Sequence, residues 1–560
     1  MRVLCNTNLK KFATKPKSGS NLSALTDNSV VEELNRLRDN VVKEGMEYKD
    51  ITIQNFLRQR PEARAKSIDI SSLNFLRVQD DSQWDKIPNL EHNLHHIVEK
   101  PGIYKLNELK NGLKPGSSDF LKKIPQPHEI DFSQIPKYMP PSQDKSLLEF
   151  AKVSNSKYLM ATSSIAYIIT QVYYLFSGFN EADYSGLPTH TSKDMKRYMN
   201  AQRKPSTSFL REVDNGVYAL DGDSGVFAPY HQILMDMGNI LEKLYTLSPE
   251  RFNAIFVKDK QNLKAYDLVE DDYHRFMRLN NDLCLRSQID CHSTLPDGQK
   301  IVYEIKTRAT APIRYDVLSY QDYLDYKLDA IVGNMGSFER EYYDLIRGGF
   351  MKYFFQLKIG DMDGALIGYH NTVENFGFEY VKRSTIEKLL FGSEYKANIV
   401  FLACSKVVTT LLDEILKSLK GKNYNFIKLG YGAMASEMKL VFTAELYEDE
   451  DYDEYKKKNL VQTHDLFEVS HYYKTERKNC KVYKYEVRLF PRLNGVYNTI
   501  ALNDIKPGDQ LEIDYVFDDC GLMDRDDYLQ FLLHAYKSIY GLLELRYGSG
   551  WLNTSQFYKF

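Results

Sequence analysis

Two carboxylates and a lysine in the middle of the chain are the residues whose types and spacing point most directly to chemistry. Asp290 ends the run LRSQID, Glu304 and Lys306 lie in the run IVYEIKTR, and a Pro-Asp-Gly turn separates the two runs. Pairing of the runs as strands would bring both carboxylates together, and paired carboxylates offer the hard oxygen ligands that Mg²⁺ prefers. A neighbouring lysine can orient an attacking water and offset charge that builds on a phosphate. The set predicts metal-dependent hydrolysis of a phosphodiester.

A purely structural interpretation of the same residues stays open. Side chains alternate between the two faces of a strand, so Glu304 and Lys306 share a polar face with Arg308 in the expected strand 301–308. The expected strand 283–292 has a matching polar row, formed by Arg286, Gln288, Asp290 and His292. An E-x-K row is also typical of a solvent-facing strand with cross-strand ion pairs.

Two expected helices lie on either side of these strands in the sequence. The run 231–247 (HQILMDMGNILEKLYTL) predicts an amphipathic helix whose Glu242 can supply a third carboxylate. A long helix is expected over 338–358, where Gly348, Lys352 and Gln356 recur at every fourth residue and so line one face. The alternatives are an exposed charge for Glu242 and a packing stripe for the second helix.

The order of these features resembles the PD-(D/E)XK nuclease superfamily, an αβββαβ core with a Mg²⁺ site at one edge of a mixed sheet. A narrower likeness lies in 285–316, LRSQIDCHSTLPDGQKIVYEIKTRATAPIRYD. This stretch resembles the fungal mitochondrial RNA-processing and RNA-degradation proteins first known through petite mutants. Further similar stretches cover much of the chain between about residues 90 and 380, at 90–106, 160–178, 236–245 and 339–372.

The resemblance implies roles for named residues. Asp290 and Glu304 would bind the metal, Lys306 would be catalytic, Glu242 would be the helix carboxylate and a further ligand, and Gln356 the last-helix residue. The metal would be Mg²⁺, with Mn²⁺ as the alternative. The substrate would be single-stranded RNA, degraded from the 5′ end during 5′-end processing of rRNA and mRNA precursors and during RNA turnover. The resemblance also implies a mitochondrial matrix location, peripheral contact with the inner membrane, and work beside a helicase–nuclease degradation complex.

Polar side chains around the expected site are candidates for phosphate contacts with the RNA. They are Arg286, Gln288, His292, Arg308, Arg314 and Lys352. Arg308 or Arg314 would read a 5′ phosphate, whereas a packing role is the alternative for His292. Two other functions stay open: a non-catalytic RNA-binding or scaffold subunit, and a DNA repair nuclease of the same fold.

Composition narrows the class of protein. The chain has 560 residues, 43% hydrophobic and 27% charged, which is ordinary globular usage and excludes disorder throughout. A formal net charge of −3 excludes binding of nucleic acid through bulk positive charge. Six scattered cysteines without C-x-x-C pairs exclude a disulfide framework and a structural zinc site. Residues 1–26 are basic and lack Asp and Glu, which predicts a mitochondrial transit peptide or else a flexible basic tail.

Alternating strand and helix patterns predict an α/β (α+β) fold. We expect a PD-(D/E)XK core, a mixed sheet flanked by helices, with large N- and C-terminal elaborations. The uncharged run 158–179 is expected to be a buried helix rather than a membrane span, because it contains several polar side chains. The expected divisions are the tail 1–26, a variable helical linker 27–87, a wrapping and helical part 88–230, the nuclease core 231–445 and a C-terminal extension 446–560.

Overall fold

The computed structural model describes most of the chain beyond residue 64. The described ranges are 65–71, 73–78, 81–109, 112–136, 138–179, 181–187, 198–223, 229–258, 273–434, 437–457, 472–497 and 505–536. All of them belong to one compact unit, residues 60–560. The expected transit peptide, residues 1–26, lies outside the described residues. None of the helices in these ranges is both long enough and apolar enough to cross a membrane.

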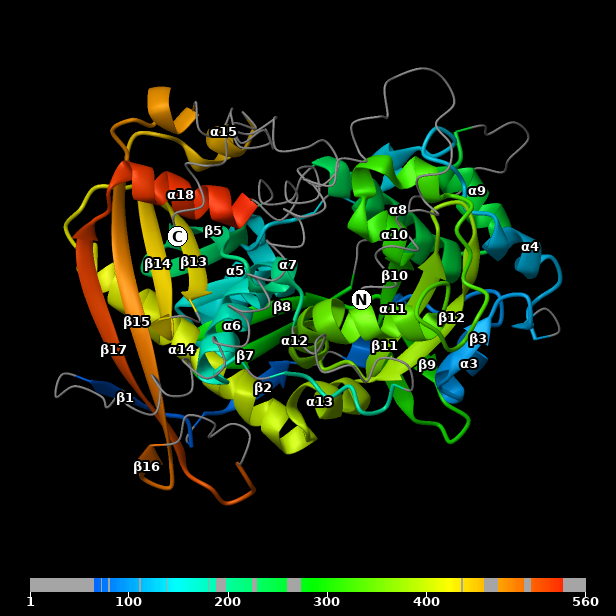
Figure 1. Cartoon of the computed structure of the whole chain (residues 1–560), viewed down its shortest axis with the longest axis horizontal. Helices are drawn as coiled ribbons and strands as arrows, with labels where there is room; N and C mark the ends of the chain where they lie inside the picture. The colour runs from blue at the N-terminus through cyan, green and yellow to red at the C-terminus, as the bar shows by residue number, and fades with distance from the viewer. Residues whose placement is uncertain are drawn as a thin grey trace, which may run out of the picture. The chain divides into compact units, whose positions relative to one another are not determined.

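The larger sheet of the described residues has twelve strands (Figure 1). Across the sheet they are β1 (Lys66–Asp69), β17 (Leu511–Leu522), β15 (Lys481–Leu493), β14 (Lys439–Tyr447), β13 (Phe426–Met434), β5 (Ser206–Asp214), β6 (Val217–Gly222), β4 (Tyr158–Ala161), β8 (Leu283–Gln288), β7 (His274–Leu279) and β2 (Phe75–Val78), with β16 (Val496–Tyr497) beside β15. The strand β4 runs parallel to both of its neighbours, and the other pairs are antiparallel. Asn215 and Gly216 turn the chain between β5 and β6 as the sequence predicts, and the φ of Gly216 is 74°.

A second, five-stranded sheet holds the residues of interest. Its order is β3 (Ile103–Lys105), β12 (Asn375–Lys382), β11 (Gly364–His370), β10 (Lys300–Ala309) and β9 (Cys291–Thr294). The strands β10 and β11 are parallel, and the other pairs are antiparallel. This mixed sheet with helices around it confirms the expected α/β class.

The chain passes from one sheet to the other at Ile289 and Asp290. The sequence predicts one strand over 283–292, but the structure ends β8 at Gln288 and begins β9 at Cys291. The N–H of Ile289 still donates to Tyr273, beside β7, at 2.9 Å, whereas β9 pairs with β10. The expectation of one continuous polar face along 286–292 is therefore wrong, because strand alternation does not extend across a change of partner strand.

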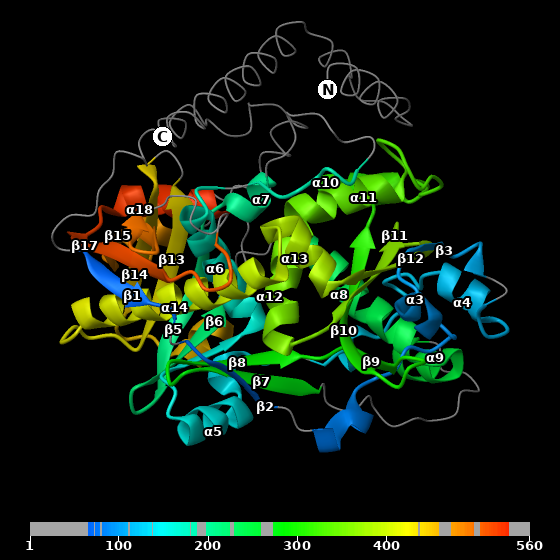
Figure 2. The same cartoon turned by 90° about the horizontal axis from the view of Figure 1, so that it is seen from below.

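Two helices lie between the sheets, and a third covers the far face of the smaller one. The helix α12 (Phe350–Gly360) packs against α6 (Thr162–Phe176), against β7 and β8, and against β11 (Figures 1 and 2). On the other side, α8 (Pro229–Thr246) packs on β10, where the alternate residues Ile301, Tyr303 and Ile305 join its apolar side chains in one core. The polar face of β10 is therefore turned toward α12.

Two expected helices differ in the structure. The run 158–179 forms β4 first and then the buried α6. The helix expected over 338–358 is α11 (Phe338–Asp344), a π-helical turn (Leu345–Gly349) and then α12. That turn contains two glycines in tight surroundings, since a Cβ at Gly348 would lie 3.3 Å from the sulfur of Met199 and a Cβ at Gly349 2.9 Å from Leu345.

The remaining α-helices of the described residues vary in length. The other helices are α3 (His95–Glu99), α4 (Ser117–Lys122), α5 (Lys145–Ser154), α7 (Asn200–Arg203), α9 (Pro249–Phe256), α10 (Ala311–Tyr315), α13 (Arg383–Phe391), α14 (Glu394–Ser418), α15 (Tyr452–Lys457) and α18 (Arg525–Tyr536). Local sequence explains many of their ends. The helix α9, for example, has Ser248 as its N-cap and Pro249 in its first turn.

Candidate active site

The register of β9 against β10 brings the two carboxylates together. Tyr303 pairs with Cys291, so Asp290, one residue before Cys291, lies opposite Glu304. The Asp290 carboxylate accepts a hydrogen bond from the backbone N–H of Ile305 at 2.9 Å. The structure therefore places Asp290, just before β9, beside Glu304 on β10, as the sequence predicts.

Glu304 is the centre of a buried polar cluster. Its side chain forms an ion pair with Lys306, and the same oxygen accepts a hydrogen bond from Gln356 Nε2 at 3.1 Å. Glu304 is 4% exposed, so the interpretation of the E-x-K row as a solvent-facing surface is wrong. The polar face of β10 and the polar stripe of α12 form one site.

Electrostatics in this cluster favour a cation. Burial, together with the charges of Glu304 and Glu242, raises the pKa of Asp290 well above its ordinary value. Burial lowers the pKa of Lys306, but the carboxylates of Glu304, Asp290 and Glu242 outweigh it, so the pKa of Lys306 lies above its ordinary value. Lys306 is therefore an ammonium ion at physiological pH, and it is flanked by three acidic side chains.

The third acid comes from α8, which lies close against the sheet at two glycines. A Cβ at Gly238 would be 3.3 Å from Thr307 Oγ1 on β10, and a Cβ at Gly368 would collide with Tyr245. This close packing explains how Glu242, between Gly238 and Tyr245 on the helix, comes near enough to influence Asp290.

The donor set fits a hard divalent cation. Asp290 and Glu304 supply carboxylate oxygens, and the buried Oε1 of Gln356 has no hydrogen-bond partner within the described ranges. In those same ranges, no three His, Cys, Asp or Glu side chains are already arranged as a ligand cluster. Asp290, Glu304 and the amide of Gln356 thus lie together as possible metal ligands. A role for Glu242 as a direct ligand stays a prediction.

Lys352 extends the site along α12. It lies one turn before Gln356, and its Nζ is 5.9 Å from the ring centre of Tyr167 on α6. Burial and the nearby charge of Lys306 lower the pKa of Lys352. Reasoning from the sequence missed Tyr167, because it belongs to an uncharged aromatic run whose spacing gives no sign of a polar neighbour.

Three other candidates for phosphate contact lie outside the carboxylate cluster. Arg286 is 5% exposed, forms a buried ion pair with Asp144 and donates to the carbonyl of Met139 at 2.6 Å. Nδ1 of the buried His292 is 2.9 Å from the carbonyl oxygen of Ile87. Gln288 ends β8, opposite His274. The structure thus uses Arg286 and His292 in internal contacts, and an RNA contact at these positions stays a prediction.

The remaining two arginines form a network at the far end of β10. Arg308 and Arg314 both form ion pairs with Glu341, which is 1% exposed, and Arg314 also donates to Asp344 at 2.8 Å. Arg308 shares the face of Glu304 and Lys306, so this network borders the site. Its ion pairs fix α10 and α11 against β10.

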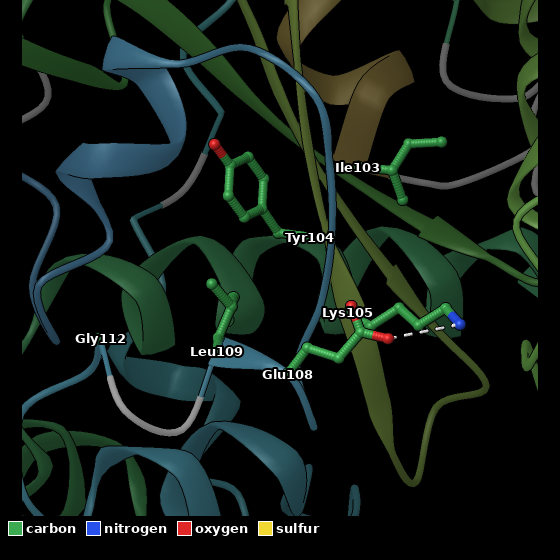
Figure 3. Close-up of a pocket in the computed structure, with 6 residues that line it drawn as sticks. All are labelled: Ile103, Tyr104, Lys105, Glu108, Leu109 and Gly112. Atoms are coloured by element: carbon green, nitrogen blue, oxygen red, sulfur yellow. Dashed lines mark ion pairs between the residues drawn. The ribbon is translucent and has the colours of Figure 1, made fainter.

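One surface pocket lies away from this chemistry (Figure 3). Its volume is about 270 Å³, and its lining includes Tyr104 and the ion pair of Lys105 with Glu108, whose charged atoms are 3.5 Å apart. The pocket adjoins β3, and the strands β12 and β11 separate β3 from β10. None of its lining residues belongs to the carboxylate cluster.

Comparisons with known proteins agree with the expected resemblance. A family described as "Mitochondrial protein Pet127" matches residues 138–413. The "mRNA degradation protein pet127, mitochondrial" of Schizosaccharomyces pombe is 30% identical over 315 residues, which cover 55% of this chain and 59% of that protein. PET127 of Saccharomyces cerevisiae, whose name assigns it provisionally to the mitochondrial translation system, is 30% identical over 263 residues, 46% of this chain and 30% of that protein.

The matches thus span less than two thirds of either relative. Both relatives are mitochondrial by name, which confirms the expected mitochondrial location.

Solved structures add no argument of their own. The crystal structure of Scheffersomyces stipitis Rai1 is 10% identical with a TM-score of 0.28, covering 73% of this chain and 97% of that one. The structure of the same protein in complex with (3′-NADP)⁺ and calcium ion is 12% identical with a TM-score of 0.25, covering 57% and 81%. Both scores are too low to support an inference about this site.

Proposed function

We propose that this chain, whose residues 138–413 match the Pet127 family of mitochondrial proteins, is a mitochondrial metal-dependent ribonuclease. Its reaction would be 5′-to-3′ exonucleolytic hydrolysis of single-stranded RNA, in 5′-end processing of precursors and in RNA turnover. The observation that carries the proposal is the buried convergence of Asp290, Glu304 and Lys306 at one strand edge. The name of the S. pombe relative, an mRNA degradation protein, favours RNA over DNA as the substrate.

The metal would be held by the acids of the cluster. Asp290 and Glu304 are the principal ligands of this proposal, with Glu242 as the third, and Mg²⁺ or Mn²⁺ fits their hard oxygens. A bound divalent ion supplies Lewis-acid activation of the phosphate and a lowered pKa for water.

The residues of this chain orient the reactants. The Ile305 N–H fixes one oxygen of Asp290, and the Gln356 amide fixes one oxygen of Glu304. The ammonium of Lys306, held by Glu304, offsets the negative charge that develops on the phosphate and positions the attacking water. Lys352, one turn along α12, is placed to contact a neighbouring phosphate of the strand.

A cleavage assay tests the proposal directly. Single-stranded RNA labelled at the 5′ end or at the 3′ end is incubated with wild-type protein or Asp290→Ala, in Mg²⁺ or in EDTA. Release of mononucleotides from the 5′ end, by the wild type alone and in Mg²⁺ alone, is the expected result. Binding without cleavage by both proteins would instead favour the scaffold function, and preferential cleavage of single-stranded DNA of equal length would favour a repair nuclease.

A further inference from the structure

An exposed aromatic residue and its apolar neighbour are held in place beside the site. Tyr138 is 59% exposed and Met139 is 51% exposed. The hydroxyl of Tyr138 lies 2.7 Å from Ser163 Oγ, and the carbonyl of Met139 accepts a hydrogen bond from Arg286. Two prolines follow, and then the N–H of Ser142 donates to the buried Asp221 at 3.0 Å. Large apolar side chains that stay exposed on an anchored backbone are typical of a binding surface.

A line of contacts joins this Tyr138–Met139 pair to the carboxylate cluster through two helices. Ser163 and Tyr167 are one turn apart on α6, and the Tyr167 ring is next to Lys352. Lys352 and Gln356 are one turn apart on α12, and Gln356 donates to Glu304. Since α6 and α12 pack together, these side chains form one wall that leads from the exposed pair to the carboxylates.

A second line of contacts reaches the same place through β8. Arg286 on β8 contacts both Met139 and Asp144, and Asp290 follows four residues later along the chain. Four residues of extended strand span about 13 Å. Both α6 and α12 contact β8 (Figures 1 and 2). The exposed pair therefore lies within a short length of nucleic-acid strand of the carboxylates.

We propose that the Tyr138–Met139 pair is a base-stacking platform for the single strand whose phosphate lies at Asp290 and Glu304. The inference rests on the proposed function and adds a subsite to it. A base has an apolar face that stacks on an aromatic ring whatever the sequence, and such a face is accessible in a single strand. Lys352 lies on the wall between the platform and the carboxylates, where the strand's phosphates would pass.

Binding measurements on the full-length protein test the platform without any need for turnover. The probe is a fluorescent oligouridylate RNA in EDTA, and the reading is its dissociation constant by anisotropy. Tyr138→Ala is expected to weaken binding about 5- to 100-fold, the range for loss of one aromatic stacking partner. Tyr138→Phe keeps the ring and is expected to bind within about 2-fold of the wild type. The matched control is Tyr497→Ala, which removes a tyrosine that is 48% exposed on β16.

Abasic substitutions in the RNA supply a second measurement. It is made on the wild-type protein and so does not depend on whether a variant folds. One abasic position is expected to weaken binding by the wild type, and to have no further effect on Tyr138→Ala, since the two changes remove the same contact. Equal affinity of Tyr138→Ala and the wild type, or an abasic scan with no sensitive position, would overturn the platform. Wild-type protein that binds RNA but never cleaves it would refute the proposed catalysis and leave the platform standing. Wild-type protein that binds no single strand would refute both.

Discussion

Asp290 accepts its hydrogen bond from the backbone N–H of Ile305, the residue that lies between Glu304 and Lys306 on β10. One peptide unit therefore connects the orientation of all three groups. A shift of β10 along its axis would move Glu304 and Lys306 together and would break the contact to Asp290. The geometry of the site thus depends on the pairing of β9 with β10 rather than on flexible side chains.

Asp290→Asn should remove cleavage while leaving the fold intact. The amide cannot act as an anionic metal ligand, so we expect a loss of at least about 100-fold in the rate of RNA cleavage. The matched control is Asp297→Asn in the exposed turn before β10, which should leave the rate unchanged. An Asp290→Asn variant that cleaves as fast as the wild type would show that the acid has no catalytic role.

Lys306→Met should separate binding from turnover. The methionine keeps the volume of the side chain but removes the ammonium that faces Glu304. We expect a cleavage rate lower by about 10²- to 10⁴-fold, the range for loss of a positioned catalytic group. The dissociation constant for RNA should change little. A parallel loss of both quantities would assign Lys306 to RNA binding instead.

Divalent metal should stabilise the folded protein. Burial and the neighbouring acids raise the pKa of Asp290, which shows that the carboxylates repel one another. A ligand at 100 times its dissociation constant adds about 2.7 kcal/mol to the free energy of unfolding. We expect Mg²⁺ or Mn²⁺ to raise the Tm of the wild type, in a thermal melt without RNA, and not that of Asp290→Asn. Identical metal-induced shifts in both proteins would place the ion elsewhere.

Glu379→Gln should change how stability depends on pH. Burial raises the pKa of Glu379 on β12 to about 7, although Tyr369 donates a hydrogen bond to it at 2.6 Å. The folded pKa lies above the unfolded value of 4.5, so the stabilisation from protonated Glu379 is complete below about pH 4.5 and is lost as pH rises through 7. The variant should lack this decline and be more stable by up to about 3 kcal/mol above pH 8. Urea unfolding at pH 5 and pH 8 measures the difference, and parallel curves would contradict the raised pKa of Glu379.

Arg286→Ala should destabilise the protein rather than merely weaken RNA binding. Removing one partner of its buried ion pair leaves the carboxylate of Asp144 uncompensated, at a typical cost of about 3–5 kcal/mol. Urea unfolding gives the measurement, with Arg278→Ala on β7 as the matched arginine control. Unchanged stability together with a smaller dependence of RNA binding on salt would restore the phosphate contact expected from the sequence.

The carboxylate cluster could be predicted from the sequence because its signals are local. Asp290 and Glu304 lie on either side of one turn, and period-two alternation puts Lys306 on the face of Glu304. The helix stripe of Lys352 and Gln356 was predictable for the same reason. Arg286 has an equally polar neighbourhood in the sequence, but its partner Asp144 is 142 residues away, and no short-range pattern reveals that pairing.

The division of the strands between two sheets also could not be predicted from the sequence. Alternation predicts a strand over 283–292 but says nothing about which strand lies beside it, and the partner changes at Ile289. The π-helical turn before α12 is similar. Gly348 in this turn lies close to Met199, a contact with a distant segment that no short-range pattern reveals.

The passage of the chain from β8 to β9 has a consequence for tolerance of insertions and deletions. Ile289 and Asp290 alone connect the two strands, and each strand is fixed by its own partner. An added or deleted residue here would turn Asp290 away from Glu304, since neighbouring strand positions face opposite sides. The turn at Pro296–Gly298 is exposed and lies beyond the pairing, so it can absorb such changes. Functional relatives of this protein should vary in length at the turn and keep two residues between β8 and β9.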